Sequence, residues 1–306
     1  MKIHLDTDIG GDMDDLCALV MLLRWPDLEI TGVTTVTDDN GRRAGYVHYV
    51  LEQAGRHDIP VAAGADVAGD YYRFKPGYPV EEDNWPEPVA PRPGSLDAAL
   101  VLLKSSIEQG AAIIAIGQFT NLRLLDERYP GILKQADLFL MGGYVYEMPQ
   151  GYPRWGNDMD YNIQLDVQSA RYVLSHSNPL LIPMTVTCQT ALRRAYLPRL
   201  GQAGRLGQLI VRQAAVFAEM YHNEQNIGLT CAGLPDDIIN FQHDPLACAI
   251  ALGWSEGVEI ETVPLKLEIR DTYLHEVVDA AGIPTRLVTK INAAAFNEYW
   301  YDMVCQ

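Results

Sequence analysis

Five aspartates lie within ten residues near the start of the chain, in the segment 5–15, which reads Leu-Asp-Thr-Asp-Ile-Gly-Gly-Asp-Met-Asp-Asp. Carboxylates packed this closely repel one another, so a cation has to compensate their charge. Carboxylate oxygens are the ligands that a hard cation such as Ca²⁺ or Mg²⁺ prefers. An alternative is that Asp12, Asp14 and Asp15 only favour the start of a helix, whose dipole attracts negative charge. That alternative leaves the two aspartates before the glycines unexplained, so the spacing indicates a metal site.

The aspartates lie where an expected strand meets an expected helix. Residues 3–8 form a strand-like pattern, and residues 16–25 form an apolar helical pattern that Pro26 ends. Gly10 and Gly11 allow the backbone to turn tightly between the two elements. Because open α/β folds bind ligands at the carboxyl edge of a parallel sheet, the cluster is placed for a function.

Apolar strand-like runs alternate with helical patterns through the first two-thirds of the 306 residues. Runs that are apolar on both faces and separated by helices are typical of a mostly parallel sheet covered on two sides. We therefore expect a single α/β domain over residues 1–306, with an open Rossmann-like sheet and helices on both faces. The expected strands are 3–8, 29–36, 61–63, 111–116, 137–141, 180–184, 258–269 and 286–291, and the expected helices are 16–25, 44–54, 95–109, 121–128, 166–175, 191–223 and 293–303.

Two long segments interrupt this alternation. Residues 66–94 and 144–161 are rich in Pro, Gly and aromatic side chains. Long segments without regular structure inside a compact chain tend to be binding loops or lids. The alternative is a surface insertion that is packed by its own aromatic residues.

Charge and composition narrow the classes of function. The formal net charge is −17, which repels nucleic acid in the absence of a basic patch. Hydrophobic residues make up 48% of the chain, enough for a large core, but the apolar runs stay shorter than the ~18 residues that a membrane span needs. The five cysteines are scattered and no signal-peptide pattern precedes the first strand, so we expect reduced thiols and a soluble, cytoplasmic protein.

Six further motifs follow the acidic segment in order, and together the seven resemble the nucleoside hydrolase family, the inosine-uridine preferring N-ribohydrolases. That family opens with a strand ending in Asp-x-Asp, followed by Gly and then Asp-Asp. The further motifs lie at residues 34–36 (Thr-Thr-Val), 60–65 (Pro-Val-Ala-Ala-Gly-Ala), 117–121 (Gly-Gln-Phe-Thr-Asn), 141–143 (Met-Gly-Gly), 160–163 (Asp-Tyr-Asn-Ile) and 243–245 (His-Asp-Pro).

The resemblance implies an enzyme that hydrolyses the N-glycosidic bond of ribonucleosides to ribose and free base with one bound Ca²⁺. It implies that Asp8, Asp15, Asp244 and the carbonyl of Ile116 hold the ion, and that Asp8 also removes a proton from the attacking water. A main-chain ligand tolerates any side chain at position 116. Asp244 precedes Pro245 and can also be a helix N-cap, a role that is compatible with ion binding.

The resemblance also points to residues that bind the sugar. Asp160 stands where the family has a longer Glu, and the alignment after the second strand is shifted by one residue, which leaves two neighbouring candidates there. The six candidates for contacts to the sugar hydroxyls are Asp14, Asp39, Asn40, Asn157, Asp160 and Asn162.

Four ring side chains are candidates for contacts to the base. His243 titrates near neutrality and is expected to protonate the leaving base, unless it is only a packing residue. Tyr221 and His222 lie on a helix whose family counterpart contributes to the base pocket, with ordinary helix surface as the alternative. Trp85 either stacks on a purine or pins its own loop.

The sequence departs from the family pattern in three places. Five residues instead of the usual three separate Asp8 from Asp14, so the loop is longer and Asp12 becomes a further candidate ligand or sugar contact. The family's His-Gly-x-x-Gly-Leu segment is replaced within residues 84–94. The family's Val-Thr-His is Val-Thr-Cys at residues 186–188. These departures concern the base pocket more than the ion and the sugar.

Two other functions stay open from the residues alone. A haloacid-dehalogenase-like phosphatase also begins with a strand ending in Asp-x-Asp and uses Mg²⁺, which would make Asp6 the nucleophile, but the downstream Lys and acidic Gly-Asp pair of that class are not evident. The other is a protein of the same fold that binds nucleoside or ribose with little turnover. The expected partner is a small nucleoside, and the resemblance implies a homo-oligomer, a dimer or a tetramer.

Overall fold

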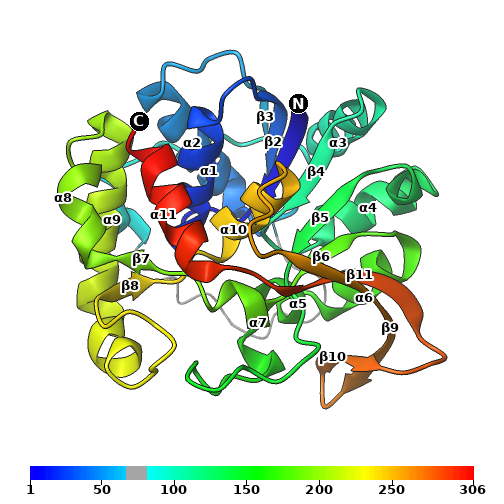
Figure 1. Ribbon diagram of the computed structural model, residues 1–306. Coiled ribbons are helices and arrows are strands. Elements are labelled where there is room, and N and C mark those ends of the chain that lie inside the picture. Colours follow the sequence, from blue (N-terminus) through cyan, green and yellow to red (C-terminus); the bar gives the residue numbers. More distant parts are fainter. Residues whose placement is uncertain (67–80) are drawn as a thin grey trace.

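A nine-stranded sheet runs through the molecule, and the other elements pack around it (Figure 1). The structure, a computed structural model, describes residues 1–66 and 81–306. The strands lie in the order β10-β9-β11-β6-β5-β4-β1-β2-β3. They are β1 (Lys2–Thr7), β2 (Glu29–Thr35), β3 (Val61–Ala63), β4 (Ala112–Ala115), β5 (Leu138–Met141), β6 (Leu180–Ile182), β9 (Glu259–Arg270), β10 (Tyr273–Val278) and β11 (Ile283–Lys290).

The strands from β11 to β3 in this order run parallel to one another, whereas β9 pairs with both β11 and β10 in antiparallel fashion. The central strands β4, β5 and β6 are buried along their whole length because they are apolar on both faces. The expectation of one α/β domain built on an open, mostly parallel sheet is confirmed.

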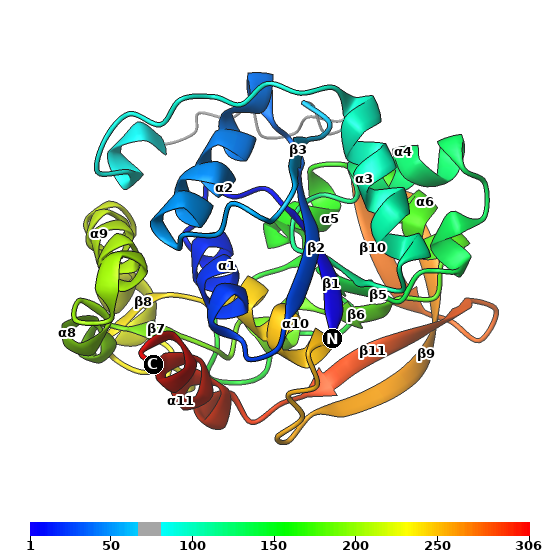
Figure 2. The same cartoon turned by 90° about the horizontal axis from the view of Figure 1, so that it is seen from above.

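Helices cover both faces of the sheet (Figure 2). Alternate residues of β4 enter different cores: Ile114 belongs to the core that includes residues of α1, α2, α9, α10 and α11, whereas Ile113 belongs to the core that includes residues of α3, α4 and α6. The helices are α1 (Asp14–Arg24), α2 (Arg42–Gln53), α3 (Leu96–Glu108), α4 (Thr120–Arg128), α5 (Tyr161–Gln164), α6 (Val167–His176), α7 (Met184–Thr187), α8 (Leu197–Leu200), α9 (Gly204–Tyr221), α10 (His243–Ala251) and α11 (Ala293–Val304).

The segment 191–223 is not the continuous helix that its pattern predicted. Its first residues form strand β7 (Leu192–Arg193), which pairs with β8 (Ile238–Asn240) in a separate two-stranded sheet. The long helix α9 begins only at Gly204, because Pro198 and the glycines that follow it interrupt the helical pattern.

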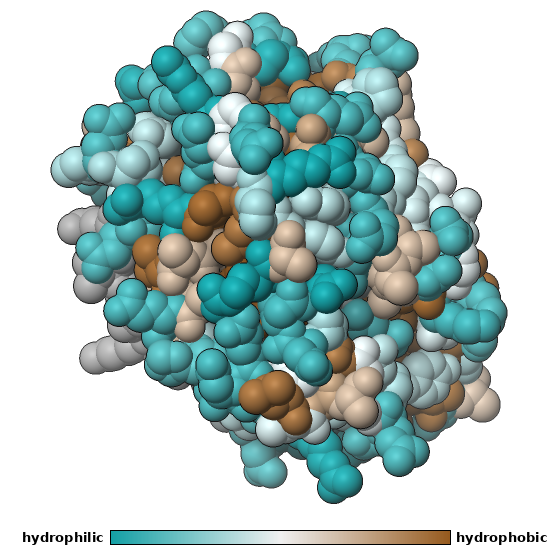
Figure 3. Space-filling view, turned by 60° about the vertical axis from the view of Figure 1, so that its left-hand side comes forward, coloured by the Kyte–Doolittle hydropathy of each residue, from teal (hydrophilic) through white to brown (hydrophobic). Residues whose placement is uncertain are grey.

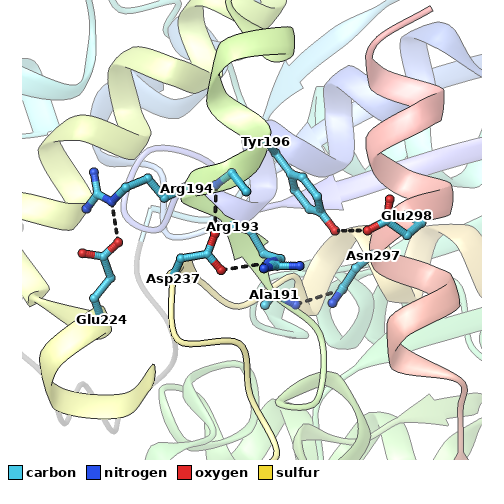
Figure 4. A network of polar contacts seen from close by, with 9 residues as sticks. Ala191, Arg193, Arg194, Tyr196, Glu224, Asp237, Asn297 and Glu298 are labelled. Carbon is cyan, nitrogen blue, oxygen red and sulfur yellow. Dashed lines mark hydrogen bonds and ion pairs between the residues drawn. The ribbon is translucent and has the colours of Figure 1, made fainter. Parts of the chain in front are cut away.

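Polar contacts fasten this broken segment to its surroundings (Figure 4). The guanidinium of Arg193 donates to Asp237 at 2.8 Å, just before β8. The hydroxyl of Tyr196 donates to Glu298 on α11, also at 2.8 Å. These contacts join β7 to β8 and to α11, which a helix through the same residues would not do.

The surface of the molecule is largely hydrophilic on the face drawn in Figure 3. Apolar residues form only small separate areas there. Among the helices that the structure describes, none has the length and apolarity needed to cross a bilayer. Residues 67–80 of the aromatic-rich segment 66–94 that the sequence singled out lie outside the described residues.

The buried amide of Asn121 joins three neighbouring segments at the carboxyl edge of the sheet. Its Nδ2 donates to Asp6 Oδ1 and to the carbonyl of Thr35, both at 2.8 Å, and its Oδ1 accepts from the backbone N–H of Ala65 at 2.9 Å. Gly64 lies so close that a Cβ atom there would come within 2.5 Å of this amide. Asn121 therefore locks the ends of β1, β2 and β3 together.

Replacing Asn121 by Ala should lower the free energy of unfolding by about 3 kcal/mol or more, because three buried groups lose a partner at about 1 to 3 kcal/mol each. Chemical denaturation of the wild type and the variant measures the difference. Asn178→Ala, at an exposed position, is the matched control and should change the free energy by less than about 0.5 kcal/mol. Equal losses in the two variants would contradict this role of Asn121.

Candidate functional site

Three aspartates from two distant parts of the chain meet at the carboxyl edge of the sheet. Asp14 and Asp15 lie in the first turn of α1, and Asp244 lies in the first turn of α10. Helices α1 and α10 pack against each other, which brings one oxygen of each carboxylate within 4.8 Å of the others. The structure thus brings together two residues that were predicted as ion ligands, Asp15 and Asp244, with Asp14 beside them.

These three carboxylates are buried and repel one another. Asp14, Asp15 and Asp244 are each at most 4% exposed. Burial, followed by the charges of the neighbouring aspartates, raises the pKa of all three carboxyls well above the ordinary value. A buried group of like charges is stable only when a cation or protons compensate it. The oxygen-only donor set fits a hard divalent cation.

A buried arginine lies next to the cluster and was not identified from the sequence. Arg43, at the start of α2, donates to the carbonyls of Ile9 at 2.9 Å and Thr37 at 2.8 Å. Burial raises the pKa of Asp8 and of Asp15, and the charge of Arg43 opposes this rise. Arg43 therefore both orders the loop after β1 and offsets part of the negative charge. A single sequence gives no sign that this arginine, rather than the neighbouring one, turns inward.

Asp8 is not among the three carboxylates whose oxygens meet within 4.8 Å, although it is a predicted ion ligand. Its charge raises the pKa of Asp15 and of Asp244, so the carboxylates share one electrostatic environment. One of its oxygens accepts from Gln118 Nε2 at 2.7 Å. Gln118 in turn accepts from the hydroxyl of Thr37. Gln118 lies inside the motif at 117–121, yet its role in orienting Asp8 was missed.

The carbonyl of Ile116 lies at the end of β4, where it meets a predicted sugar-binding residue. Asn162 Nδ2 donates to this carbonyl at 2.9 Å and to the carbonyl of Met141 at 3.2 Å. The amide therefore bridges the ends of β4 and β5. Asp160, two residues earlier, accepts from the backbone N–H groups of Gly143 and Ile163, and burial raises its pKa to about 6.

Asp12 and two tyrosines lie at the exposed mouth of the site. Asp12 accepts from Asn240 Nδ2 and from the backbone N–H of Asp14, so the longer loop is tied to the end of β8. Burial, followed by the charge of Asp12, raises the pKa of Tyr161 and of Tyr221. Tyr161 and Tyr221 are 50% and 43% exposed. Tyr161 was missed, although it lies in the motif at 160–163.

His243 is the first residue of α10, next to Asp244. Its Nδ1 is 2.7 Å from the hydroxyl of Thr187, and its ring lies against that of Phe241. Burial lowers the pKa of His243 to about 4. The imidazole is therefore neutral near pH 7, with one ring nitrogen held by Thr187, and it does not titrate near neutrality as the sequence predicted.

Four further predicted substrate contacts are exposed or have a protein partner in the structure. Asn157 donates to the carbonyl of Leu274 at 3.0 Å, on β10, and thus has a structural partner. Asp39 and Asn40 are exposed on a short turn, because their neighbour Asp38 takes the buried position and accepts from the backbone of α2. His222 is exposed and ends α9 with a φ of 50°.

Trp85 is a packing residue in this structure. Its ring is 2% exposed and stacks on that of Tyr46, with ring centroids 4.5 Å apart. Tyr49 contacts the same indole edge-on. Of the two roles expected from the sequence, the structure supports the one in which Trp85 pins its own segment to α2.

Comparison with known proteins identifies the family. Residues 3–298 match the family described as inosine-uridine preferring nucleoside hydrolase. The chain is 28% identical over 274 residues to the pyrimidine-specific ribonucleoside hydrolase RihA of Klebsiella pneumoniae, which covers 86% of this chain and 81% of that protein.

Solved structures of similar proteins share the fold. The purine-preferring ribonucleoside hydrolase from Gardnerella vaginalis superposes with a TM-score of 0.79 at 17% identity, covering 100% of this chain and 98% of the other. The inosine-uridine preferring nucleoside hydrolase from Bacillus anthracis gives 0.70 at 17% identity, with 99% of each chain covered. Because the family match spans nearly the whole chain, this protein belongs to the inosine-uridine preferring nucleoside hydrolases, enzymes that act on N-glycosyl bonds.

Proposed function

We propose that this protein hydrolyses ribonucleosides to ribose and free base with Ca²⁺ held at the acidic cluster. The observation that carries the proposal is the meeting of the buried carboxylates of Asp14, Asp15 and Asp244 at the carboxyl edge of the sheet. The haloacid-dehalogenase alternative loses its support for two reasons. The chain belongs to a family that acts on N-glycosyl bonds, and Asp244 meets the N-terminal aspartates, which that alternative did not predict. The nucleoside is a small molecule, in keeping with the net charge of −17, which opposes nucleic-acid binding.

The ion would be held by Asp8, Asp15, Asp244 and the carbonyl of Ile116. Calcium accepts six to eight oxygens, so when bound it supplies a site for a water and for the 2′- and 3′-hydroxyls of the ribose. Carboxylates at the first turns of two helices fit this role, because each helix N-terminus also stabilises the negative charge of its aspartate.

Asp8 is the best candidate for the general base. Burial raises its pKa, while Gln118 fixes one oxygen and leaves the other to accept a proton from water. Gln118 follows β4, the neighbour of β1 in the sheet, so its amide can hold the Asp8 carboxylate in one orientation.

The sugar would be bound by Asp14, Asp160 and Asn162. In glycoside hydrolysis the sugar develops oxocarbenium character, and hydrogen bonds to its hydroxyls strengthen in the transition state. Asn162 is suited to this because its amide is already held by two strand-end carbonyls. Asp12 offers a further contact at the mouth of the site.

The leaving base would lie toward His243, Tyr161 and Tyr221. Neutral His243, with Nδ1 held by Thr187, has its other nitrogen available to exchange a hydrogen bond with the departing base. The two exposed phenols offer ring faces for stacking.

A nucleoside screen tests the proposed function. Purine and pyrimidine ribonucleosides are incubated with the protein and Ca²⁺, and released base is measured by chromatography. A phosphate ester is assayed in parallel, and binding of the same nucleosides is measured by calorimetry. Release of free base supports the proposal. Binding without release would favour a nucleoside-binding protein instead, and phosphate release alone would favour a phosphatase.

Asp8→Asn should lower kcat by ~10²–10⁴-fold, because the amide cannot take a proton from water. Steady-state kinetics measure the loss, and circular dichroism checks that the fold is kept. Asp137→Asn, an exposed change on the surface, is the matched control and should keep wild-type kcat. Turnover of Asp8→Asn equal to that of the control would remove Asp8 from the mechanism.

Chelation should lower both the melting temperature and the activity, because a ligand that binds only the folded state stabilises it. Differential scanning calorimetry with chelator, and again after adding back excess Ca²⁺, measures the shift. Asp244→Asn should shrink the shift that Ca²⁺ produces. A melting curve that is the same with chelator and with Ca²⁺ would count against a bound ion.

His243→Ala should lower kcat for nucleosides by ~10-fold or more, since the departing base loses its hydrogen-bond partner. The same variant should retain most of its activity on p-nitrophenyl riboside, whose leaving group departs without being protonated. Thr187→Val, which frees His243 Nδ1, should show a weaker form of the same pattern. An equal loss on both substrates would argue against a role at the leaving base.

A further inference from the structure

A cavity of about 670 Å³ lies between the first half of α11 and the segment that carries β7. Binding sites for small molecules commonly have volumes of about 300 to 1,000 Å³. The walls include Gln189 and Arg193 on one side and residues 290–294, Asn297 and Glu298 on the other. None of the residues proposed to hold the ion, the sugar or the base lines this cavity, so it is separate from the catalytic site.

The buried amide of Asn297 has a donor that the protein does not use. Asn297 is 8% exposed, and its Oδ1 accepts from the backbone N–H of Ala191 at 2.9 Å (Figure 4). That bond fixes the orientation of the amide, because an N–H group needs an acceptor opposite it. Nδ2 has no hydrogen-bond partner among residues 1–66 and 81–306, and Asn297 lines the cavity. This donor is therefore available to a molecule inside the cavity.

The first turn of α11 adds two backbone donors to the same wall. Asn292 caps the helix: its side chain accepts from the N–H of Ala295 at 3.2 Å, and its carbonyl accepts from the N–H of Phe296 at 3.0 Å. The N–H groups of Ala293 and Ala294 have no acceptor within the described part of the chain, and both residues line the cavity. Unsatisfied N–H groups at a helix N-terminus, together with the helix dipole, favour a bound anion.

The charged side chains in the walls also favour an anion. Arg193 pairs with Asp237 at 2.8 Å and Lys290 pairs with Glu259 at 2.6 Å, but neither of these carboxylates lines the cavity. Among the described lining residues the acidic one is Glu298, which accepts a hydrogen bond from a tyrosine hydroxyl. Two cations and the donors of α11 thus face one carboxylate, in a chain whose net charge is −17.

Tyrosine rings form part of the same walls. Tyr196 stacks on Tyr301 with ring centroids 4.1 Å apart, which holds its ring in place. The ring of Tyr152 lies so close to Gly233 that a Cβ atom there would be 2.7 Å from it. Aromatic side chains provide apolar surface for the organic part of a ligand. The cavity therefore suits an organic anion better than a bare inorganic ion.

We propose that this cavity is a second binding site, separate from the acidic cluster, for a small aromatic anion. Its carboxylate or phosphate lies between Asn297 Nδ2 and the first turn of α11, where Lys290 and Arg193 add positive charge, and its ring packs against the tyrosines. The site does not depend on the proposed function, because no residue of the catalytic mechanism takes part in it.

Isothermal titration calorimetry of the protein with Ca²⁺ tests this site with phenyl phosphate and with benzoate, and benzamide is the uncharged control ligand. At least one of the two anions should bind the wild type with a Kd ~10-fold or more below that of benzamide, because hydrogen bonds to a charged group are the stronger ones. The anion that binds more tightly shows whether the site takes a phosphate or a carboxylate.

Two variants locate the bound anion. Asn297→Asp keeps an oxygen for the N–H of Ala191 but replaces Nδ2 by negative charge, and Ala294→Glu places a carboxylate at the first turn of α11. Each should weaken binding of the anion ~10-fold or more. Ala280→Glu adds the same charge at an exposed position outside the cavity and is the matched control, so it should bind the anion as the wild type does.

Thermal unfolding checks that the variants fold. Ala294→Glu should keep or raise the melting temperature, because negative charge in the first turn stabilises a helix, so it tests the site even if Asn297→Asp fails to fold. If neither anion binds the wild type more tightly than benzamide, or if Ala294→Glu binds the anion as tightly as Ala280→Glu, the cavity is not an anion site. Failure of the protein to release base from nucleosides would leave this result unchanged.

Discussion

Mutual repulsion among buried carboxylates is the constraint on which the rest of the structure depends. Asp14, Asp15 and Asp244 are removed from water and placed within reach of one another, an arrangement that raises their pKa values and destabilises the folded chain unless positive charge compensates it. The N-termini of α1 and α10 and the charge of Arg43 compensate part of this negative charge. The remaining charge is what makes the site suited to a divalent cation.

Side-chain amides hold the parts of the site together. Asn121 joins the ends of β1, β2 and β3, Gln118 orients Asp8, and Asn162 bridges the carbonyls that end β4 and β5. Gln164 fixes β10 to α5 in the same manner. An amide can donate and accept without adding charge, so it can order an acidic site without neutralising it.

The sequence predicted the parts of the site that are local. The Asp-rich turn after β1 and the alternation of strands and helices could be predicted because the residue patterns that indicate them span only a few residues. Asp244 was identified through its motif. Arg43 and Gln118 were missed because their roles come from contacts between distant segments. Near Asp38, a shift of the alignment by one residue exchanges the buried and the exposed side chains. The break in the helical pattern between residues 191 and 204 depends on the pairing of β7 with β8.

The central claim is that these carboxylates converge on one hard cation that binds the sugar diol. A crystal structure of the protein grown with Ca²⁺ and a non-hydrolysable nucleoside analogue tests it most directly. The account predicts density for a single ion that contacts Asp15, Asp244 and the carbonyl of Ile116, with the 2′- and 3′-hydroxyls completing its coordination. Carboxylates that point apart with no density between them, or an analogue bound elsewhere, would contradict it.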